Sequence, residues 1–160
     1  MSLLFATAGT KLYIGGAKAF SGADLTASDF EGESWEEIGG VTNLGSAGDT
    51  SELITSNQIG IARTRKRKGT RNAGAMEVVM DLDYSDAGQL DLIAAEATKN
   101  SYAFRLVFND APSGGTPSER LFVAYVMSVS EQYDEANSIM KLNSTLEIDS
   151  NIVRVPAAAE

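Results

Sequence analysis

The chain contains no cysteine and no histidine, and these absences exclude much of the chemistry that 160 residues could otherwise perform. Without cysteine there can be no disulfide, iron–sulfur cluster or thiolate zinc site. Without histidine the chain lacks the commonest general base and metal ligand, so serine–histidine and cysteine–histidine nucleophile systems cannot be built within it. We therefore expect a non-enzymatic protein with no cofactor and no metal site.

Long apolar runs are missing as well. None approaches the roughly 20 residues that span a bilayer, and Met1 to Gly9 lacks the basic region that opens a signal peptide. The length suits one domain, which by size scaling buries roughly 68 to 70% of its unfolded surface. The sequence thus predicts a single soluble domain over residues 1–160, made without Sec export and without a membrane partner.

Positive charge is scarce and concentrated in one segment. Six of the thirteen Lys and Arg residues lie between Arg63 and Arg71, whereas the other 151 residues carry seven cations and all twenty-two acids. The net charge of −9 argues against a general nucleic-acid binder, because each uncompensated carboxylate weakens attraction to phosphates. We call the six cations the basic patch: Arg63, Arg65, Lys66, Arg67, Lys68 and Arg71.

Several roles are open for the basic patch. It has the charge for a nucleic-acid contact, although no aromatic residues are interleaved with it to stack on bases. Its composition also fits a nuclear-localisation-like run or a plain solvated loop. An acidic chain offers the patch many partners on a second copy of itself, which favours self-assembly. The candidate contact residues between subunits are the basic patch together with Asp49 and Glu52.

Alternating apolar residues predict several half-buried strands. We expect strands at Lys11–Ile14, Trp35–Val41 with a bend at Gly39-Gly40, Ile59–Arg63, Met76–Asp83, Phe104–Phe108, Leu121–Ser130 and Met140–Asp149. The first half of the 121–130 strand is apolar on both faces, so we expect it to be covered on both sides. The basic patch would then form the tip or shoulder of a hairpin-like connection.

One helix is expected, through about Lys99, with Ser85 as its N-cap and Asp86 complementing the helix dipole. Its apolar positions are Ala87, Leu90, Ile93, Ala94 and Ala97. Strands before and after a single helix predict a mainly β (α+β) fold, an antiparallel β-sandwich or barrel with one flanking helix. Such a fold leaves open sheet edges, which a ring of subunits can remove by sharing strands.

Two other segments carry expectations. Residues 43–57 are rich in glycine and hydroxyl residues, which predicts a long loop, and residues 156–160 predict a frayed end. Gly45 to Thr50 lacks the Lys-Ser/Thr ending of a phosphate-binding loop. The carboxylates of Asp81, Asp83 and Asp86 do not follow the calcium-loop spacing, and we interpret them as a solvated strand face and a helix cap.

The order of these features resembles the major tail, or tail tube, proteins of long-tailed bacteriophages. The resembling segments are Trp35–Val41, the loop around Gly45 and Gly48, Lys68–Gly74 leading into Met76–Leu82, Asp86–Leu90, and Phe104-Arg105. They span about half of the chain. The run from Arg63 to Lys68 is more basic than the family would lead us to expect.

The resemblance implies a β-sandwich with a flanking helix, six copies in a ring, and rings stacked into a tube that carries the phage genome. The implied partners are further copies of the chain, the tape measure protein, the tail terminator and the distal tail or baseplate proteins. The implied location is the virion tail, assembled in the cytoplasm of the bacterial host. DNA would pass transiently, without specific binding, and the long loop would suit contact between rings.

An acidic or polar strand face would repel phosphates and keep a passing genome from sticking. The candidate lumen-facing residues are Glu77, Asp81 and Asp83 on one strand and Asn143, Thr145 and Glu147 on another. Other hypotheses stay open: a tail terminator, a capsid-decorating protein, a type VI secretion tube protein, or a nucleic-acid-binding module that uses the basic patch.

Overall fold

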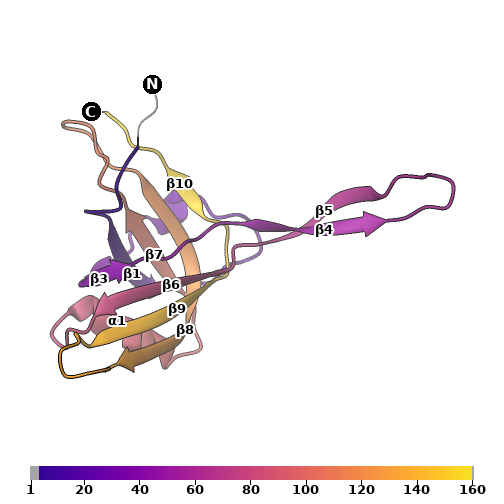
Figure 1. The fold of residues 1–160 in the computed structure, drawn as a ribbon. Coiled ribbons are helices and arrows are strands. Elements are labelled where there is room, and N and C mark those ends of the chain that lie inside the picture. The colour runs from indigo at the N-terminus through magenta and orange to yellow at the C-terminus, as the bar shows by residue number, and fades with distance from the viewer. Residues whose placement is uncertain (1–3, 160) are drawn as a thin grey trace.

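A computed structural model describes residues 4–159, and every strand pair in it is antiparallel. The strands are β1 (Lys11–Ala17), β2 (Glu36–Ile38), β3 (Val41–Asn43), β4 (Thr50–Ser56), β5 (Arg65–Asn72), β6 (Ala75–Asp81), β7 (Tyr102–Val107), β8 (Glu119–Gln132), β9 (Lys141–Ile148) and β10 (Val153–Val155). The helix α1 (Ala87–Glu96) follows β6, and a short 3-10 helix η1 (Ala27–Phe30) precedes β2. The expected mainly β, antiparallel fold with one flanking helix is confirmed (Figure 1).

The body is one curled sheet with the order β2-β1-β7-β8-β9-β6-β3, and β10 also pairs with β8. Its outermost strands, β2 and β3, are separated in the chain only by Gly39 and Gly40, so the two edges of the sheet must approach each other. Gly40 turns this corner at φ 73°, and its carbonyl accepts a 2.8 Å hydrogen bond from the Asp81 amide. The single bent strand expected at 35–41 is therefore two strands at opposite edges, because paired glycines permit a full corner.

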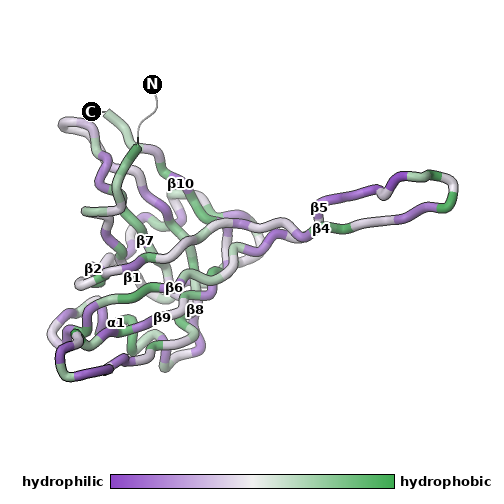
Figure 2. The backbone as a smooth tube through the Cα atoms, in the orientation of Figure 1, coloured by the Kyte–Doolittle hydropathy of each residue, from purple (hydrophilic) through white to green (hydrophobic). Residues whose placement is uncertain are grey.

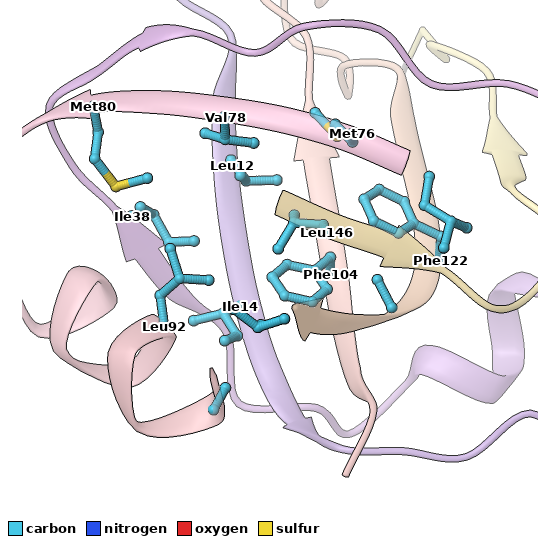
Figure 3. Close-up of a cluster of buried hydrophobic side chains, with 14 of the residues drawn as sticks. Leu12, Ile14, Ile38, Met76, Val78, Met80, Leu92, Phe104, Phe122 and Leu146 are labelled. Atoms are coloured by element: carbon cyan, nitrogen blue, oxygen red, sulfur yellow. The ribbon is translucent and has the colours of Figure 1, made fainter. Parts of the chain in front are cut away.

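The main core fills the inside of this curl (Figure 3). Phe104 of β7 and Phe122 of β8 are buried and stack with centroids 5.7 Å apart, and Leu12, Met76 and Leu146 pack around them. A smaller cluster forms on the other side of β8, where Phe30, Ala103, Leu121 and Val123 meet. The first half of β8 is thus covered on both faces, as its apolar sequence predicted.

The helix packs with a different face from the one expected. Its buried residues are Gly88, Gln89, Leu92 and Ala95, whereas Leu90 and Ile93 are 49% and 38% exposed. Asp86, not Ser85, is the N-cap, and its Oδ2 accepts from the amides of Gln89 and Gly39. The rotation follows from Gly88, where any side chain would collide with the carbonyl of Glu37 in β2. The contact face of α1 is thus set by the small residue Gly88 rather than by the apolar residues Leu90 and Ile93.

Gln89 joins the helix to the corner between the two sheet edges. Its side chain is 1% exposed, donates 2.9 Å hydrogen bonds to the carbonyls of Gly39 and Asp81, and accepts from the Asp83 amide at 3.0 Å. Three backbone groups thus depend on one amide side chain.

Gln89→Leu is expected to lower the free energy of unfolding by about 2–4 kcal/mol, because it leaves these backbone groups unpaired at roughly 1–3 kcal/mol each before relaxation. Urea unfolding followed by circular dichroism measures the change. Gln58→Leu, at an exposed glutamine far from the core, is the matched control and should change stability by less than about 0.5 kcal/mol. A Gln89 variant as stable as the control would contradict this role.

Strands β4 and β5 form a separate two-stranded sheet that projects far from the body (Figure 1). This corrects three expectations. Residues 50–56 are a strand rather than part of a 43–57 loop, most of the basic patch is strand β5 rather than a connection, and Ile59 and Ile61 lie in the turn. The hairpin has no buried face, so hydrophobic periodicity could not reveal it.

The end of the chain makes two contacts with the body. Ala158 pairs with Thr116, and the Ala157 amide donates to Ser118 Oγ. Residues 1–3 and Glu160, which the sequence expectations included, lie outside the described residues. Within residues 4–159, no helix combines the length and apolar character needed to cross a membrane.

Candidate functional site: a projecting hairpin and a polar sheet face

The hairpin carries the opposite charge to the rest of the protein. Residues 49–72 contain six cations and two acids, whereas the remaining residues contain seven cations and twenty acids. Figure 2 shows the hairpin as a mostly hydrophilic arm with an apolar segment at its turn. Such an arm is complementary to the body of another copy.

The base of the hairpin is fixed by contacts within the chain. Arg71 forms a 2.6 Å ion pair with Asp49, and Thr70 Oγ1 donates to Glu52 at 3.4 Å. Ile54 covers Gly69, where a Cβ would lie 2.9 Å from Ile54 Cδ1. The two acids and Arg71, all expected at subunit contacts, are thus engaged within the hairpin, and their contacts to other subunits stay predictions.

The outer part of the hairpin has no partner within the described chain. The other five cations, Arg63, Arg65, Lys66, Arg67 and Lys68, form no ion pair with any described residue. The apolar side chains Leu53, Ile54, Ile59 and Ile61 are 42–107% exposed. An isolated two-stranded hairpin is marginally stable in water, so this arm is suited to be stabilised by a partner surface.

A second surface, the polar sheet face, is formed by the outward side chains of β6, β9 and the second half of β8. Antiparallel partners share a face, and the register pairs Glu77 with Thr145, Asp81 with Lys141, and Ala75 with Glu147. Asn143 pairs with Val79, and therefore five of the six expected lumen residues lie on one face. The sixth, Asp83, lies beyond the end of β6.

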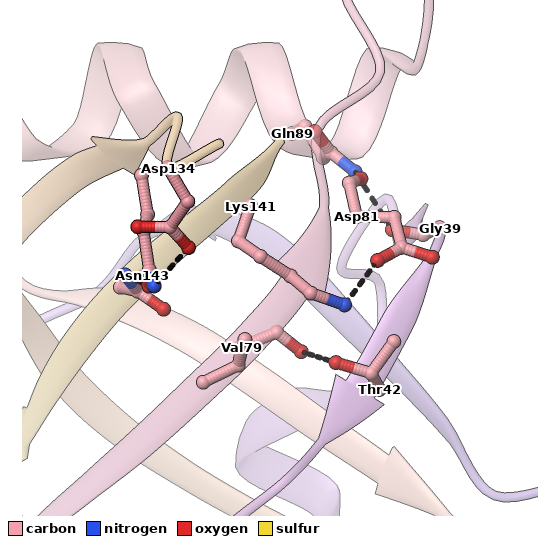
Figure 4. A network of polar contacts seen from close by, with 9 residues as sticks. Gly39, Thr42, Val79, Asp81, Gln89, Asp134, Lys141 and Asn143 are labelled. Carbon is pink, nitrogen blue, oxygen red and sulfur yellow. Dashed lines mark hydrogen bonds and ion pairs between the residues drawn. The ribbon is translucent and has the colours of Figure 1, made fainter. Parts of the chain in front are cut away.

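Polar contacts order this face (Figure 4). Lys141 Nζ lies 2.6 Å from Asp81 Oδ1, Thr42 Oγ1 donates to the Val79 carbonyl, and Asn143 Nδ2 donates to Gln132 Oε1 at 3.1 Å. Because Lys141 is paired with Asp81, two acids on this face, Glu77 and Glu147, form no ion pair with any described residue. The face is polar with an excess of negative charge.

Sequence reasoning missed the contribution of β8 to this face. Ser128 and Ser130 pair with Thr145 and Asn143, so their side chains share it. A register shift between Val126 and Ser128 moves the later residues to the other face relative to a regular strand. The change from apolar to serine positions after Val126 was the available signal.

One edge of this part of the sheet is open. Strand β7 pairs with β8 only as far as Ala124, so residues 125–132 of β8 have β9 on one side and no strand on the other within the described residues. Unpaired edge groups are available for pairing with another chain.

No group of three or more Asp or Glu residues within 4–159 is placed to hold a metal ion. Asp83 and Asp110, two carboxylates in loops, each have a lowered pKa because each accepts hydrogen bonds from the hydroxyl and amide of one serine, Ser85 or Ser118. The features that stand out are the hairpin, the polar sheet face and the open edge, all of which suit association.

Comparison with known structures shows that the chain has the tail tube fold. A chain of the anti-feeding prophage baseplate, in a 6-fold symmetrised structure, superposes with a TM-score of 0.71 and 10% identity, covering 98% of each chain. The SPP1 tail tube gives a TM-score of 0.67 and 14% identity, covering 98% of this chain and 81% of that one.

A sheath/tube terminator of an extracellular contractile injection system gives a TM-score of 0.66 and 12% identity, covering 96% of this chain and 98% of that one. No protein-family model matches the sequence, and no curated protein matches it either. At these identities the similarity concerns the fold. The chain therefore shares its architecture with tube and tube-terminator components of phage tails and contractile injection systems.

Proposed function

We propose that this protein is a structural, non-enzymatic subunit that polymerises as stacked rings into a hollow tail tube, through which phage DNA passes. The observation that carries the proposal is the cationic hairpin, which projects from the acidic body of a protein with the tail tube fold. The cations of its outer part form no ion pair with any described residue of the same chain. Rings of six follow from the resemblance, as do a tail location, assembly in the host cytoplasm, and contacts with tape measure, terminator and distal tail proteins.

Ring formation has support in the open edge of β8. Pairing of residues 125–130, the part of this edge before the end of β8, with a strand of the next subunit would continue the sheet from copy to copy and remove its unpaired backbone groups. A closed ring of such sheets has an inner and an outer face. The polar sheet face, with its excess of acids, is the one suited to line a channel for DNA.

Sedimentation velocity across a range of protein and salt concentrations tests the self-assembly. We expect large species whose abundance rises with protein concentration and falls with added salt, because contacts between exposed charges are screened. A monomer at every concentration and salt level would contradict the proposal. Salt-sensitive binding of DNA by that monomer would instead favour the nucleic-acid-binding alternative.

The lumen assignment predicts the behaviour of Glu77→Lys combined with Glu147→Lys. Tubes of this variant should bind a short linear DNA at least tenfold more tightly than wild-type tubes, because phosphates are then attracted rather than repelled. Closed circular DNA, which cannot thread into a tube, should bind no better than it does to the wild type. Fluorescence anisotropy and gel shift measure the two binding reactions.

The matched control for this prediction is Glu31→Lys with Glu36→Lys, which changes the charge equally at exposed positions outside the polar sheet face. It should give no preference for linear over circular DNA. Equal gains in binding of circular and linear DNA by the Glu77 and Glu147 variant would place the polar sheet face outside the tube.

A further inference from the structure

The end of the protein opposite the hairpin carries a second unusual surface. The hairpin ends at Asn72, and β6 runs from Ala75 away from it to Asp81. Because Asp81 pairs with Lys141 in the antiparallel strand β9, the connection between β8 and β9 lies at the far end of β6. Figure 1 shows this connection as the orange loop beside α1, on the other side of the body from the hairpin.

This far end combines acids with exposed apolar side chains. We call it the end patch, with the acids Asp83, Glu131, Asp134 and Glu135 and the side chains Tyr84, Tyr133, Ile139 and Met140. The last four are 67%, 56%, 66% and 43% exposed. The patch thus offers negative charge and apolar surface together.

Several contacts hold the end patch together. The Leu82 amide donates to the Met140 carbonyl at 3.0 Å, which joins the exit from β6 to the β8–β9 connection. Tyr133 Oη donates to Glu131 Oε2 at 2.6 Å, and this bond, the Glu131 charge and nearby Tyr84 raise the pKa of Tyr133. Hydrogen bonds from the Ser85 hydroxyl and amide lower the pKa of Asp83.

The end patch is complementary to the outer part of the hairpin in charge, and both surfaces expose apolar side chains. The hairpin presents five cations without a described ion-pair partner, together with Leu53, Ile54, Ile59 and Ile61. Other acids occur on the body, but the end patch adds exposed aromatic and aliphatic side chains to them. Apolar contact adds affinity, and charge complementarity adds orientation and rate of association.

We propose that the end patch is the docking site for the β4–β5 hairpin of a second copy of this chain. The two surfaces lie at opposite ends of the protein, so the contact is head-to-tail and each docked copy presents a new hairpin for the next one. Such heterologous contacts propagate along an axis without closing. The inference rests on the proposed function and specifies which surface joins one ring to the next.

Complementary charge reversals test the contact. One variant carries Lys66→Glu and Arg67→Glu in the hairpin, and the other carries Glu131→Lys and Glu135→Lys in the end patch. Each alone should raise the protein concentration needed for assembly more than tenfold, because like charges then meet. An equimolar mixture should assemble again. The acidic hairpin of the first variant matches the lysine-bearing end patch of the second, and the cationic hairpin of the second matches the acidic end patch of the first.

The outcomes separate this inference from the proposed function. Glu31→Lys with Glu36→Lys changes charge as much as the patch variant does, at exposed positions on another surface, and should assemble like the wild type. If the wild type assembles and the patch variant assembles equally well, the docking site is wrong while the tube function stands. If the mixture of the two reversals fails to assemble, the docking site is also wrong. If the wild type never assembles, the proposed function itself fails.

The absence of cysteine allows a direct test of proximity in assembled protein. In a protein carrying both Ile59→Cys and Ile139→Cys, oxidation or a short thiol cross-linker should give a ladder of covalent multimers on a denaturing gel. Either single variant can at most give a dimer. A double variant that assembles but yields no species beyond the dimer would overturn the contact.

Discussion

Replacing residues 52–70 with Asn-Gly is expected to stop growth along the tube axis while leaving the body folded. Ser51 and Arg71 are cross-strand partners, so a two-residue turn can join them directly in a short hairpin. The replacement removes the exposed apolar residues of the arm and five of its six cations. The Arg71 to Asp49 ion pair at the base remains.

The body should be unaffected because residues 50–72 contribute nothing to either hydrophobic core cluster. We expect its free energy of unfolding to change by less than about 1 kcal/mol, as for other surface changes. Circular dichroism and urea unfolding check the fold, and electron microscopy checks assembly. Tubes of ordinary length from this variant would show that the hairpin is dispensable.

The largest effect on stability is expected from Phe104→Ala. Phe104 is 0% exposed and stacks on Phe122 within the main core. Truncation of its side chain to Ala therefore leaves a cavity that the neighbouring side chains fill only in part. The expected loss is about 3–5 kcal/mol of unfolding free energy, typical of Phe→Ala in a core. That is a large fraction of the roughly 5–15 kcal/mol available to a domain.

Ile54→Ala is the matched control, because Ile54 is 51% exposed on the hairpin and outside both core clusters. It should cost the isolated subunit less than about 1 kcal/mol. Urea unfolding of both variants at a concentration below assembly measures the difference. Equal losses would mean that the hairpin, rather than the curl of the sheet, holds the subunit together.

Periodicity predicted the longer strands of the sheet, β1, β6, β7, β8 and β9, because each of them has buried residues on at least one face, whereas the three-residue strand β10, which has none, was not predicted. The alternation of Met76, Val78 and Met80 with polar residues gave β6, and the doubly apolar start of β8 gave its coverage on both sides. The antiparallel fold with one helix followed from the order of these elements. Burial of one face of a strand against a core produces a regular alternation of apolar and polar residues, and these segments show it.

The hairpin strands show no such alternation. They face water on both sides within the subunit, so β4 looked like a loop and β5 like a charged connection. Only the concentration of charge indicated that the segment was special. The sequence indicated a bend at Gly39-Gly40, but not that β2 and β3 lie at opposite edges of the sheet, because their pairing depends on how the whole sheet curls.

The polar sheet face was predictable in part. Alternation on β6 and β9 identified Glu77 and Glu147 as outward-facing, but two separate strands gave no reason to place them on one surface. The antiparallel register of β6 with β9 does so, and the register shift in β8 adds Ser128 and Ser130. Register between distant strands is set by tertiary packing, which single-strand patterns do not contain.

Electron microscopy of the concentrated, purified 160-residue protein tests the central claim most directly. The account predicts hollow cylinders of uniform diameter built from stacked rings, with the β4–β5 hairpin of each subunit reaching into the adjacent ring. Particles that stay monomeric at every concentration and salt level, or rings in which the hairpin points into solvent and touches no other subunit, would contradict it.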